Sequence, residues 1–113
     1  IFIPGAVPPS GNEMRREFRN MHAYAALRKQ WTNWLHNWRL AERIEPEQLP
    51  CWTKKRTKVS VHVAHSRARL LDDDNLSDGL KPVYDSLRRC GFIVNDSMRW
   101  MDRVPPTQER VEQ

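Results

Sequence analysis

The sequence predicts a small α+β domain, in which a mixed β-sheet carries two main helices packed on one face. From about residue 21 to residue 44, apolar side chains recur at the three-and-four spacing of one helical face. Val59, Val61 and Val63 alternate with polar residues, which is the period of a half-buried strand. Because 113 residues normally build one core, we expect a single domain spanning residues 1–113.

The N-terminal elements follow from turn residues and helical spacing. We expect residues 2–4 to end a first strand and residues 7–12, with two prolines, to form an extended turn. Trp31, Trp34 and Trp38 all lie on the apolar stripe of the first main helix. The indoles could stack on exposed bases or fill the core, and the shared stripe favours the core.

The C-terminal elements follow the acidic cluster at residues 72–74. A second helix is expected to end at Cys90, with Gly91 at its C-terminal cap. Residues 92–94 are predicted to form a short apolar strand and residues 98–104 another strand, and a last edge strand is expected from Gln108.

The charge is distributed unevenly along the chain. Residues 1–69 hold thirteen Lys or Arg against five Asp or Glu, a balance of +8, while residues 70–113 hold six against nine, a balance of −3. A basic body with an acidic pocket suits an enzyme that cuts phosphodiester bonds, since cations hold the polyanion and carboxylates hold a metal. The simpler interpretation is that a net charge of +5 only keeps the domain soluble.

Several classes of protein are disfavoured. No apolar run approaches the length of a membrane span and no signal-peptide pattern is present, so we expect a cytoplasmic protein without membrane contact. Cys51 and Cys90 are too few for a disulfide framework and wrongly spaced for a zinc ribbon. His62 and His65 fall in a predicted strand, where a spacing of three directs their rings to opposite faces.

The acidic cluster is the strongest chemical signal. Asp72 and Asp74 are two residues apart, so in an extended segment they share a face and can bind one cation, while Asp73 points away. Asp96 follows in a later turn and could return beside them. Three carboxylates with waters and a phosphate oxygen would complete an octahedral Mg²⁺ shell.

Two other interpretations of the cluster exist. A calcium loop starting at Asp74 fails because Leu76 occupies a ligand position, Lys81 occupies an apolar one and Pro82 falls inside the loop. The aspartates could instead cap a helix, with Asp74 or Asn75 as the N-cap residue. Capping would explain one aspartate but not the cluster.

The order and spacing of five sequence pieces resemble the RusA-type Holliday-junction resolvases, a family that is also common in prophages. These pieces are Pro8-Pro9-Ser10-Gly11-Asn12, Asp72-Asp73-Asp74-Asn75-Leu76, Lys81 with Asp85-Ser86-Leu87, Gly91, and Asn95-Asp96. Two details depart from the family pattern. The interval from Asn75 to Asp85 is longer, so counting from Asn75 reaches Asp78 rather than a lysine, and Asn95 replaces an acidic residue.

The resemblance implies an Mg²⁺-dependent, or Mn²⁺-dependent, endodeoxyribonuclease that acts as a homodimer on four-way DNA junctions in recombination and repair. Asp72, Asp74 and Asp96 would be the catalytic metal ligands, and Lys81 would stabilise charge on the phosphoryl oxygens while an activated water attacks phosphorus. The residues expected to support the ligands are Asn75, Asp85 and Asn95. The residues expected to contact the DNA backbone are Lys54, Lys55, Arg56, Lys58, Arg67 and Arg69.

Two further functions stay open on the sequence. One is a metal-dependent nuclease that acts on flaps or other branched DNA. The other is a catalytically inactive DNA-binding module, which the amide at Asn95 makes conceivable.

Overall fold

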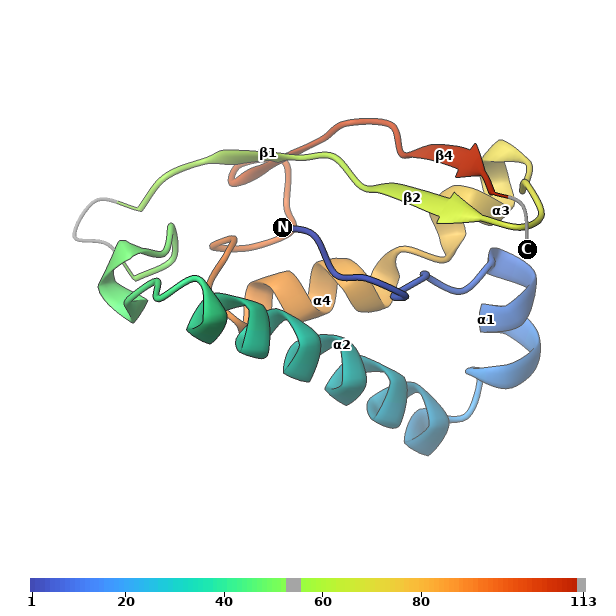
Figure 1. The fold of residues 1–113 in the computed structure, drawn as a ribbon, viewed down its shortest axis with the longest axis horizontal. Helices are drawn as coiled ribbons and strands as arrows, with labels where there is room; N and C mark the ends of the chain where they lie inside the picture. The colour runs from blue at the N-terminus through green and yellow to red at the C-terminus, as the bar shows by residue number, and fades with distance from the viewer. Residues whose placement is uncertain (53–55, 112–113) are drawn as a thin grey trace.

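The strands form one layer, and the two longest helices lie on one side of it (Figure 1). The computed structural model describes residues 1–52 and 56–111. β1 (Val59–Val61) pairs with β3 (Met101–Arg103), and β2 (Ala64–Arg67) pairs with β4 (Thr107–Arg110), both in parallel. The predicted α+β class is confirmed, but in the described part of the chain the sheet is two parallel two-stranded ladders rather than one mixed sheet.

β1 and β2 belong to one extended stretch that is interrupted at His62 and Val63. The chain stays paired across the interruption, since the Thr107 N–H donates to the Val63 carbonyl oxygen at 3.0 Å. The alternation of Val59, Val61 and Val63 appears as half-buried valines packed against the core.

Two predicted strands are absent from the described chain. Residues 2–4 make no ladder, and the Ala6 N–H closes a turn on the Ile3 carbonyl oxygen at 3.3 Å. Residues 92–94 form bends, although Ile93 is only 1% exposed. The apolar run after Gly91 was therefore a loop that fills the core, which periodicity cannot distinguish from a short strand.

The segment predicted as an extended turn gives way to a helix, α1 (Gly11–Glu17). Ser10 Oγ accepts from the Glu13 N–H at 3.0 Å, and Glu13 Oε1 accepts from the Ser10 N–H at 3.3 Å. This reciprocal capping box satisfies two amide donors that a helix start otherwise leaves free. The spacing Ser10 to Glu13 was the sequence signal for α1.

The first main helix is confirmed as α2 (Met21–Ala41), which begins after the N-cap residue Asn20. Trp31 is 6% exposed, and its ring meets the Trp34 ring edge to face with centroids 4.9 Å apart. Trp38 packs on Phe92 with centroids at 5.9 Å. The indoles thus serve the core rather than offering a face for stacked bases. The following connection carries a short 3₁₀ helix, η1 (Pro46–Gln48).

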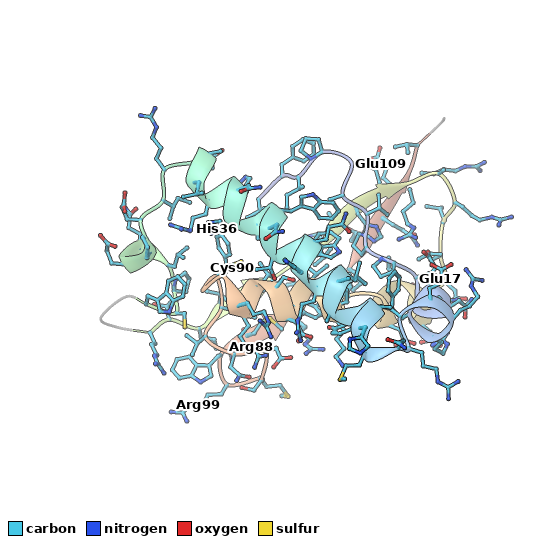
Figure 2. The ribbon with its side chains drawn as sticks, turned by 90° about the horizontal axis from the view of Figure 1, so that it is seen from below. Glu17, His36, Arg88, Cys90, Arg99 and Glu109 are labelled. Carbon is cyan, nitrogen blue, oxygen red and sulfur yellow. The ribbon has the colours of Figure 1, made fainter. Side chains whose placement is uncertain are left out.

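The second main helix is α4 (Lys81–Arg89), which ends at Cys90 as predicted. Gly91 adopts a φ of +83°, and the Phe92 N–H returns to the Leu87 carbonyl oxygen at 3.0 Å, which is a Schellman ending. The buried Cys90 thiol donates to the Thr32 carbonyl oxygen of α2 at 3.5 Å, and Figure 2 shows Cys90 beside α2. Burial raises the pKa of this thiol, as expected for an inert core cysteine.

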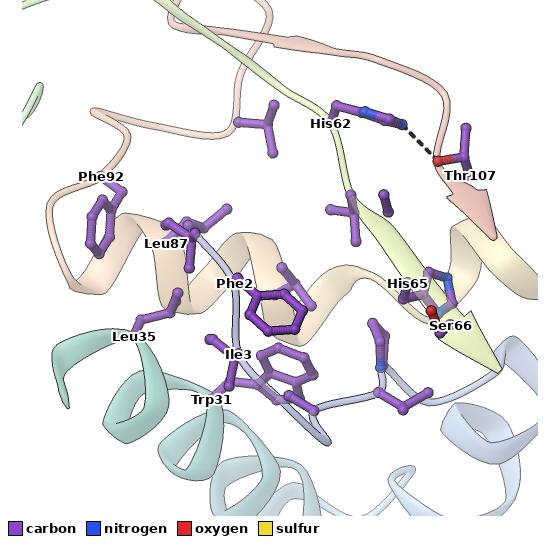
Figure 3. A pocket seen from close by; sticks show the side chains of 18 of the residues that line it. Phe2, Ile3, Trp31, Leu35, His62, His65, Ser66, Leu87, Phe92 and Thr107 are labelled. Atoms are coloured by element: carbon purple, nitrogen blue, oxygen red, sulfur yellow. Dashed lines mark hydrogen bonds between the residues drawn. The ribbon is translucent and has the colours of Figure 1, made fainter. Parts of the chain in front are cut away.

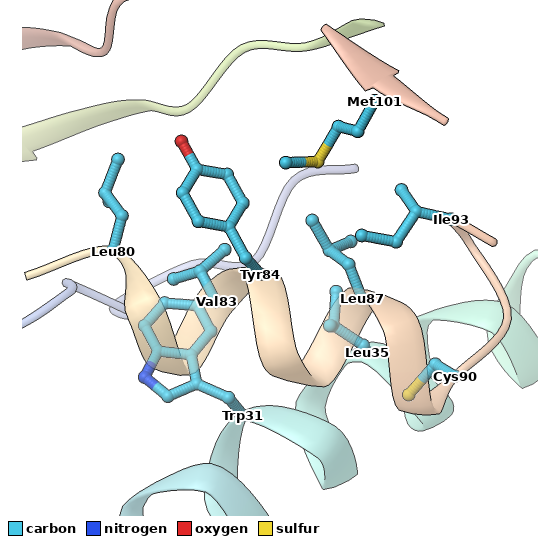
Figure 4. Close-up of a cluster of buried hydrophobic side chains, with 9 residues drawn as sticks. All are labelled: Trp31, Leu35, Leu80, Val83, Tyr84, Leu87, Cys90, Ile93 and Met101. Carbon is cyan, nitrogen blue, oxygen red and sulfur yellow. The ribbon is translucent and has the colours of Figure 1, made fainter. Parts of the chain in front are cut away.

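The core lies between α2, α4 and the start of β3 (Figure 4). Its buried members are Trp31, Leu35, Leu80, Val83, Tyr84, Leu87, Cys90, Ile93 and Met101. No helix in the described ranges is long and apolar enough to cross a membrane.

Leu80→Ala should lower the free energy of unfolding by about 2–5 kcal/mol, because this side chain is 1% exposed and its removal leaves a cavity. Urea denaturation followed by tryptophan fluorescence measures the change. Leu40→Ala is the matched control, since Leu40 is 54% exposed and its loss should cost less than about 1 kcal/mol. Equal losses for the two variants would contradict this placement of the core.

Candidate functional site

The acidic cluster begins a helix, α3 (Asp73–Asp78), rather than continuing as an extended segment. Asp72 is its N-cap residue, and its Oδ1 accepts from the Asn75 N–H at 2.9 Å. The predicted same-face arrangement of Asp72 and Asp74 on extended backbone was therefore wrong, because only Asp72 is extended. The capping interpretation holds, but for Asp72 rather than for Asp74 or Asn75. The helix dipole favours the carboxylates at this end.

Asn75 connects this acidic segment to α1. Its Nδ2 donates to Asp72 Oδ2 at 3.1 Å, while its Oδ1 accepts from the Asn12 N–H at 3.1 Å and from Arg15 Nη2 at 3.2 Å. One amide side chain thus fixes the orientation of the Asp72 carboxylate and joins segments 63 residues apart in the sequence. Asn75 lies where it can support the carboxylates, the role that the sequence suggests for it.

Two glycines permit this contact between the segments. A Cβ on Gly79 would lie 1.7 Å from the Pro9 carbonyl oxygen, and a Cβ on Gly11 would lie 2.8 Å from Asp78 Cβ. Real Cβ atoms do not approach other atoms so closely, so each position requires glycine for packing rather than for its backbone dihedrals. The Pro8–Asn12 motif, which ends in the first turn of α1, and the acidic segment therefore form one structural unit.

Asp96 and Lys81 lie at a neighbouring hollow of about 330 Å³. The hollow is lined by Ser77, Asp78, Lys81, Tyr84, Asp85, Asp96 and Arg103. The Asp96 carboxylate lies 3.6 Å from Arg103 Nη2, which places a cation beside it. Neither Asp72 nor Asp74 lines this hollow, so the structure brings together only two of the four predicted catalytic residues, Lys81 and Asp96.

Tyr24 of α2 connects Lys81 and Asp85, which are one helical turn apart on α4. Its hydroxyl donates to Asp85 Oδ2, and Lys81 Nζ lies over its ring at 5.1 Å from the centroid. Burial and the bond to Asp85 raise the pKa of Tyr24, so the phenol stays a hydrogen-bond donor. The sequence does not reveal this role of Tyr24, because a contact with a residue 61 positions away leaves no local pattern.

The residues do not form a metal cage in this arrangement. Among residues 1–52 and 56–111, no group of three His, Cys, Asp or Glu side chains is close enough to hold a metal ion. Asp72, Asp74 and Asp96 therefore do not converge, although carboxylates have the right chemistry for Mg²⁺. Asn95 Oδ1 accepts from the Ser97 N–H at 2.9 Å and shapes the local turn.

The predicted DNA-contacting cations differ in their surroundings. Arg67 is only 11% exposed in its side chain, and its Nη1 donates to the Pro8 carbonyl oxygen at 2.8 Å, so it holds the loop before α1. Lys58 pairs with Asp102 at 3.1 Å and stays half exposed. Arg56 and Arg69 are exposed. Lys54 and Lys55 lie outside the described residues.

A cavity of about 770 Å³ lies between the N-terminal segment, the strands and the main helices (Figure 3). It is mostly apolar and is lined by none of the predicted catalytic residues. His62 is directed to Thr107, with Nε2 and Oγ1 3.0 Å apart, whereas both ring nitrogens of His65 are buried without a hydrogen-bond partner in the described structure. Burial, and then the charge of Arg67, lowers the pKa of His65, so its ring stays neutral.

Comparisons with protein-family models, with curated proteins and with solved structures found no match to this chain. The resemblance to the RusA-type pattern therefore rests on the motifs and on their order in the chain.

Gly79→Ala should lower the free energy of unfolding by about 2 kcal/mol or more, because the new methyl group meets the backbone of Pro9 and one segment must move. Thermal and urea unfolding measure this loss. Ser77→Ala, at an exposed position of the same helix, should change stability by less than about 0.5 kcal/mol. A Gly79→Ala protein as stable as the unmodified chain would show that the Pro9 contact is not close in solution.

Proposed function

We propose that this chain is a metal-dependent endodeoxyribonuclease of the RusA type, which resolves four-way DNA junctions as a homodimer in recombination and repair. One observation carries the proposal: the Pro8–Asn12 motif and the acidic segment at Asp72, two distant pieces of the pattern, are held together through Asn75. Two motifs that serve the same site are expected to lie together in the structure.

The exposure of the charged groups supports a polyanionic substrate. Asp72, Asp73 and Asp74 are exposed at the start of α3, so a large substrate can reach them. Lys81 is exposed at the first position of α4 and can approach a phosphate. The DNA backbone would be bound, without contacts to the bases, by Arg56, Lys58 and Arg69. Arg67 is instead hydrogen-bonded to the Pro8 carbonyl oxygen.

The metal is Mg²⁺, with Mn²⁺ as a substitute. Bound metal would supply Lewis-acid chemistry to the phosphate. The carboxylates of Asp72 and Asp74 would contribute oxygen ligands, and the proposal requires Asp96 to approach them in the metal-bound form. Isothermal titration with Mg²⁺ or Mn²⁺ tests this requirement independently of cleavage.

A homodimer follows from the symmetry of the substrate. A four-way junction is cut in two symmetry-related strands, so two copies related by a two-fold axis would place one site at each strand. Each protomer has one acidic segment and would therefore act on one of the two strands.

A DNA-binding module without hydrolysis is the second candidate. It is favoured by the absence of a three-carboxylate group among the described residues and by the amide at Asn95. Binding of junctions without cutting in either Mg²⁺ or Mn²⁺ would establish it.

Asp74→Asn should abolish junction cleavage in Mg²⁺ and leave junction binding at low salt intact, because the change removes one negative ligand without removing a phosphate contact. Cleavage is measured on a fixed four-way junction and on a flap with matching arms, and preference for the flap would redirect the proposal to branched-DNA cleavage. Asp73→Asn, in the same helical turn, is the control for lost charge and should keep cutting. Cleavage by Asp74→Asn at the unmodified rate would remove Asp74 from the site.

Lys81→Ala should slow the cleavage step by roughly 10²–10³-fold under single-turnover conditions, the range for loss of one group that stabilises transition-state charge. Binding should weaken only slightly. Arg88→Ala, an exposed cation of the same helix, should leave the cleavage rate nearly unchanged. Equal slowing by both variants would indicate a general charge effect and would not support a specific role for Lys81.

A further inference from the structure

A hollow of about 560 Å³ opens beside α1. α1 and α3 meet at this end of the molecule (Figure 1). It is lined by Gly11, Met14, Arg15, Arg19 and Asp78. Neither arginine belongs to the sequence pieces that resemble the RusA-type pattern. Two guanidinium groups against one carboxylate leave the hollow with a positive balance.

The Arg15 guanidinium is oriented by three side chains. Its Nη2 donates to Asn12 Oδ1 at 2.7 Å and to Asn75 Oδ1 at 3.2 Å, and its Nη1 donates to Asp78 Oδ2 at 3.2 Å. The side chain is nevertheless 60% exposed. A cation that is already fixed loses little conformational freedom when an anion binds, which favours tight contact.

Arg19 supplies a positive charge that the described protein does not neutralise. It is exposed and has no ion pair or hydrogen bond among the residues that the structure describes. It directly precedes Asn20, the N-cap residue of the 21-residue helix α2, so the positive end of a long helix dipole adds to its field. The fixed Arg15 and the unpaired Arg19 thus face the same space.

We propose that Arg15 and Arg19 form a seat for a phosphodiester group of the DNA strand that passes the acidic segment. This inference rests on the proposed function, because it names a contact of the same substrate. Asn75 touches both Arg15 and Asp72, so the seat and the carboxylates are held in a fixed relation to each other. One short stretch of the DNA backbone can therefore contact the two arginines at one end and reach the carboxylates at the other.

The test is the salt dependence of binding to a labelled four-way junction, measured by fluorescence anisotropy with Ca²⁺ in place of Mg²⁺ to suppress cleavage. Each phosphate contact contributes about 0.9 to the slope of log K against log salt concentration. Arg19→Ala should therefore reduce the slope by about 0.9 and weaken binding several-fold at low salt. Circular dichroism confirms that the variant is folded.

Arg16→Ala is the matched control. Arg16 lies on α1, close to Arg19 in the sequence, and carries the same charge, but it pairs with Glu17 at 3.2 Å and does not line the hollow. Its loss should leave the slope unchanged. Equal reductions for Arg16→Ala and Arg19→Ala would overturn the seat, since net charge alone would then explain both.

Arg15→Lys provides a second variant that keeps the positive charge but removes the planar guanidinium group. It should weaken binding while reducing the slope by less than Arg19→Ala does. If the unmodified protein binds junctions and neither arginine variant alters the binding, the seat is disproved and the proposed nuclease stands. If the unmodified protein binds no junction, or binds polyglutamate more tightly than DNA, both the seat and the nuclease proposal fail.

Discussion

The arrangement of the candidate site depends on the side-chain amide of Asn75. It donates to the Asp72 carboxylate and accepts from the backbone of Asn12 and from Arg15, so it is satisfied on both sides. Substitution by aspartate would keep the acceptor but remove the donor to Asp72 and place two carboxylates in contact. Gly79 and Gly11 allow the segments to come close enough for these bonds. This contact network thereby fixes the acidic segment against α1.

Charges of opposite sign meet where the two halves of the chain touch. Arg15 with Asp78 and Lys58 with Asp102 are ion pairs between residues 1–69 and residues 70–113. Exposed pairs contribute little to stability, in the range of about 0–1 kcal/mol each. These pairs matter for where they place the charges. Asp78, the partner of Arg15, lines both the hollow beside α1 and the hollow that contains Lys81 and Asp96. A polyanion held by the cations would therefore lie beside the carboxylates.

Local signals explain which elements the sequence could predict. The apolar stripe gave α2 to within a few residues, and Gly91 marked the end of α4, because both signals act within one or two helical turns. Residues 92–94 were misread as a strand since burial of Ile93 in a loop leaves the same short apolar run. The start of α1 was encoded locally by Ser10 and Glu13, but the two prolines before them favoured a turn.

The sequence by itself determined the motif set, the uneven charge and the main helices, because each depends on residue types and on spacings within a short segment. Only the tertiary structure decided the partners of the charged groups. It turned Arg67 inward to Pro8, made Asp72 a helix cap, set Asp96 beside Arg103, and joined Tyr24 to Asp85. The physical reason is that a hydrogen bond or an ion pair depends on distance in space, and contacts across about 60 residues of chain leave no periodicity in the sequence.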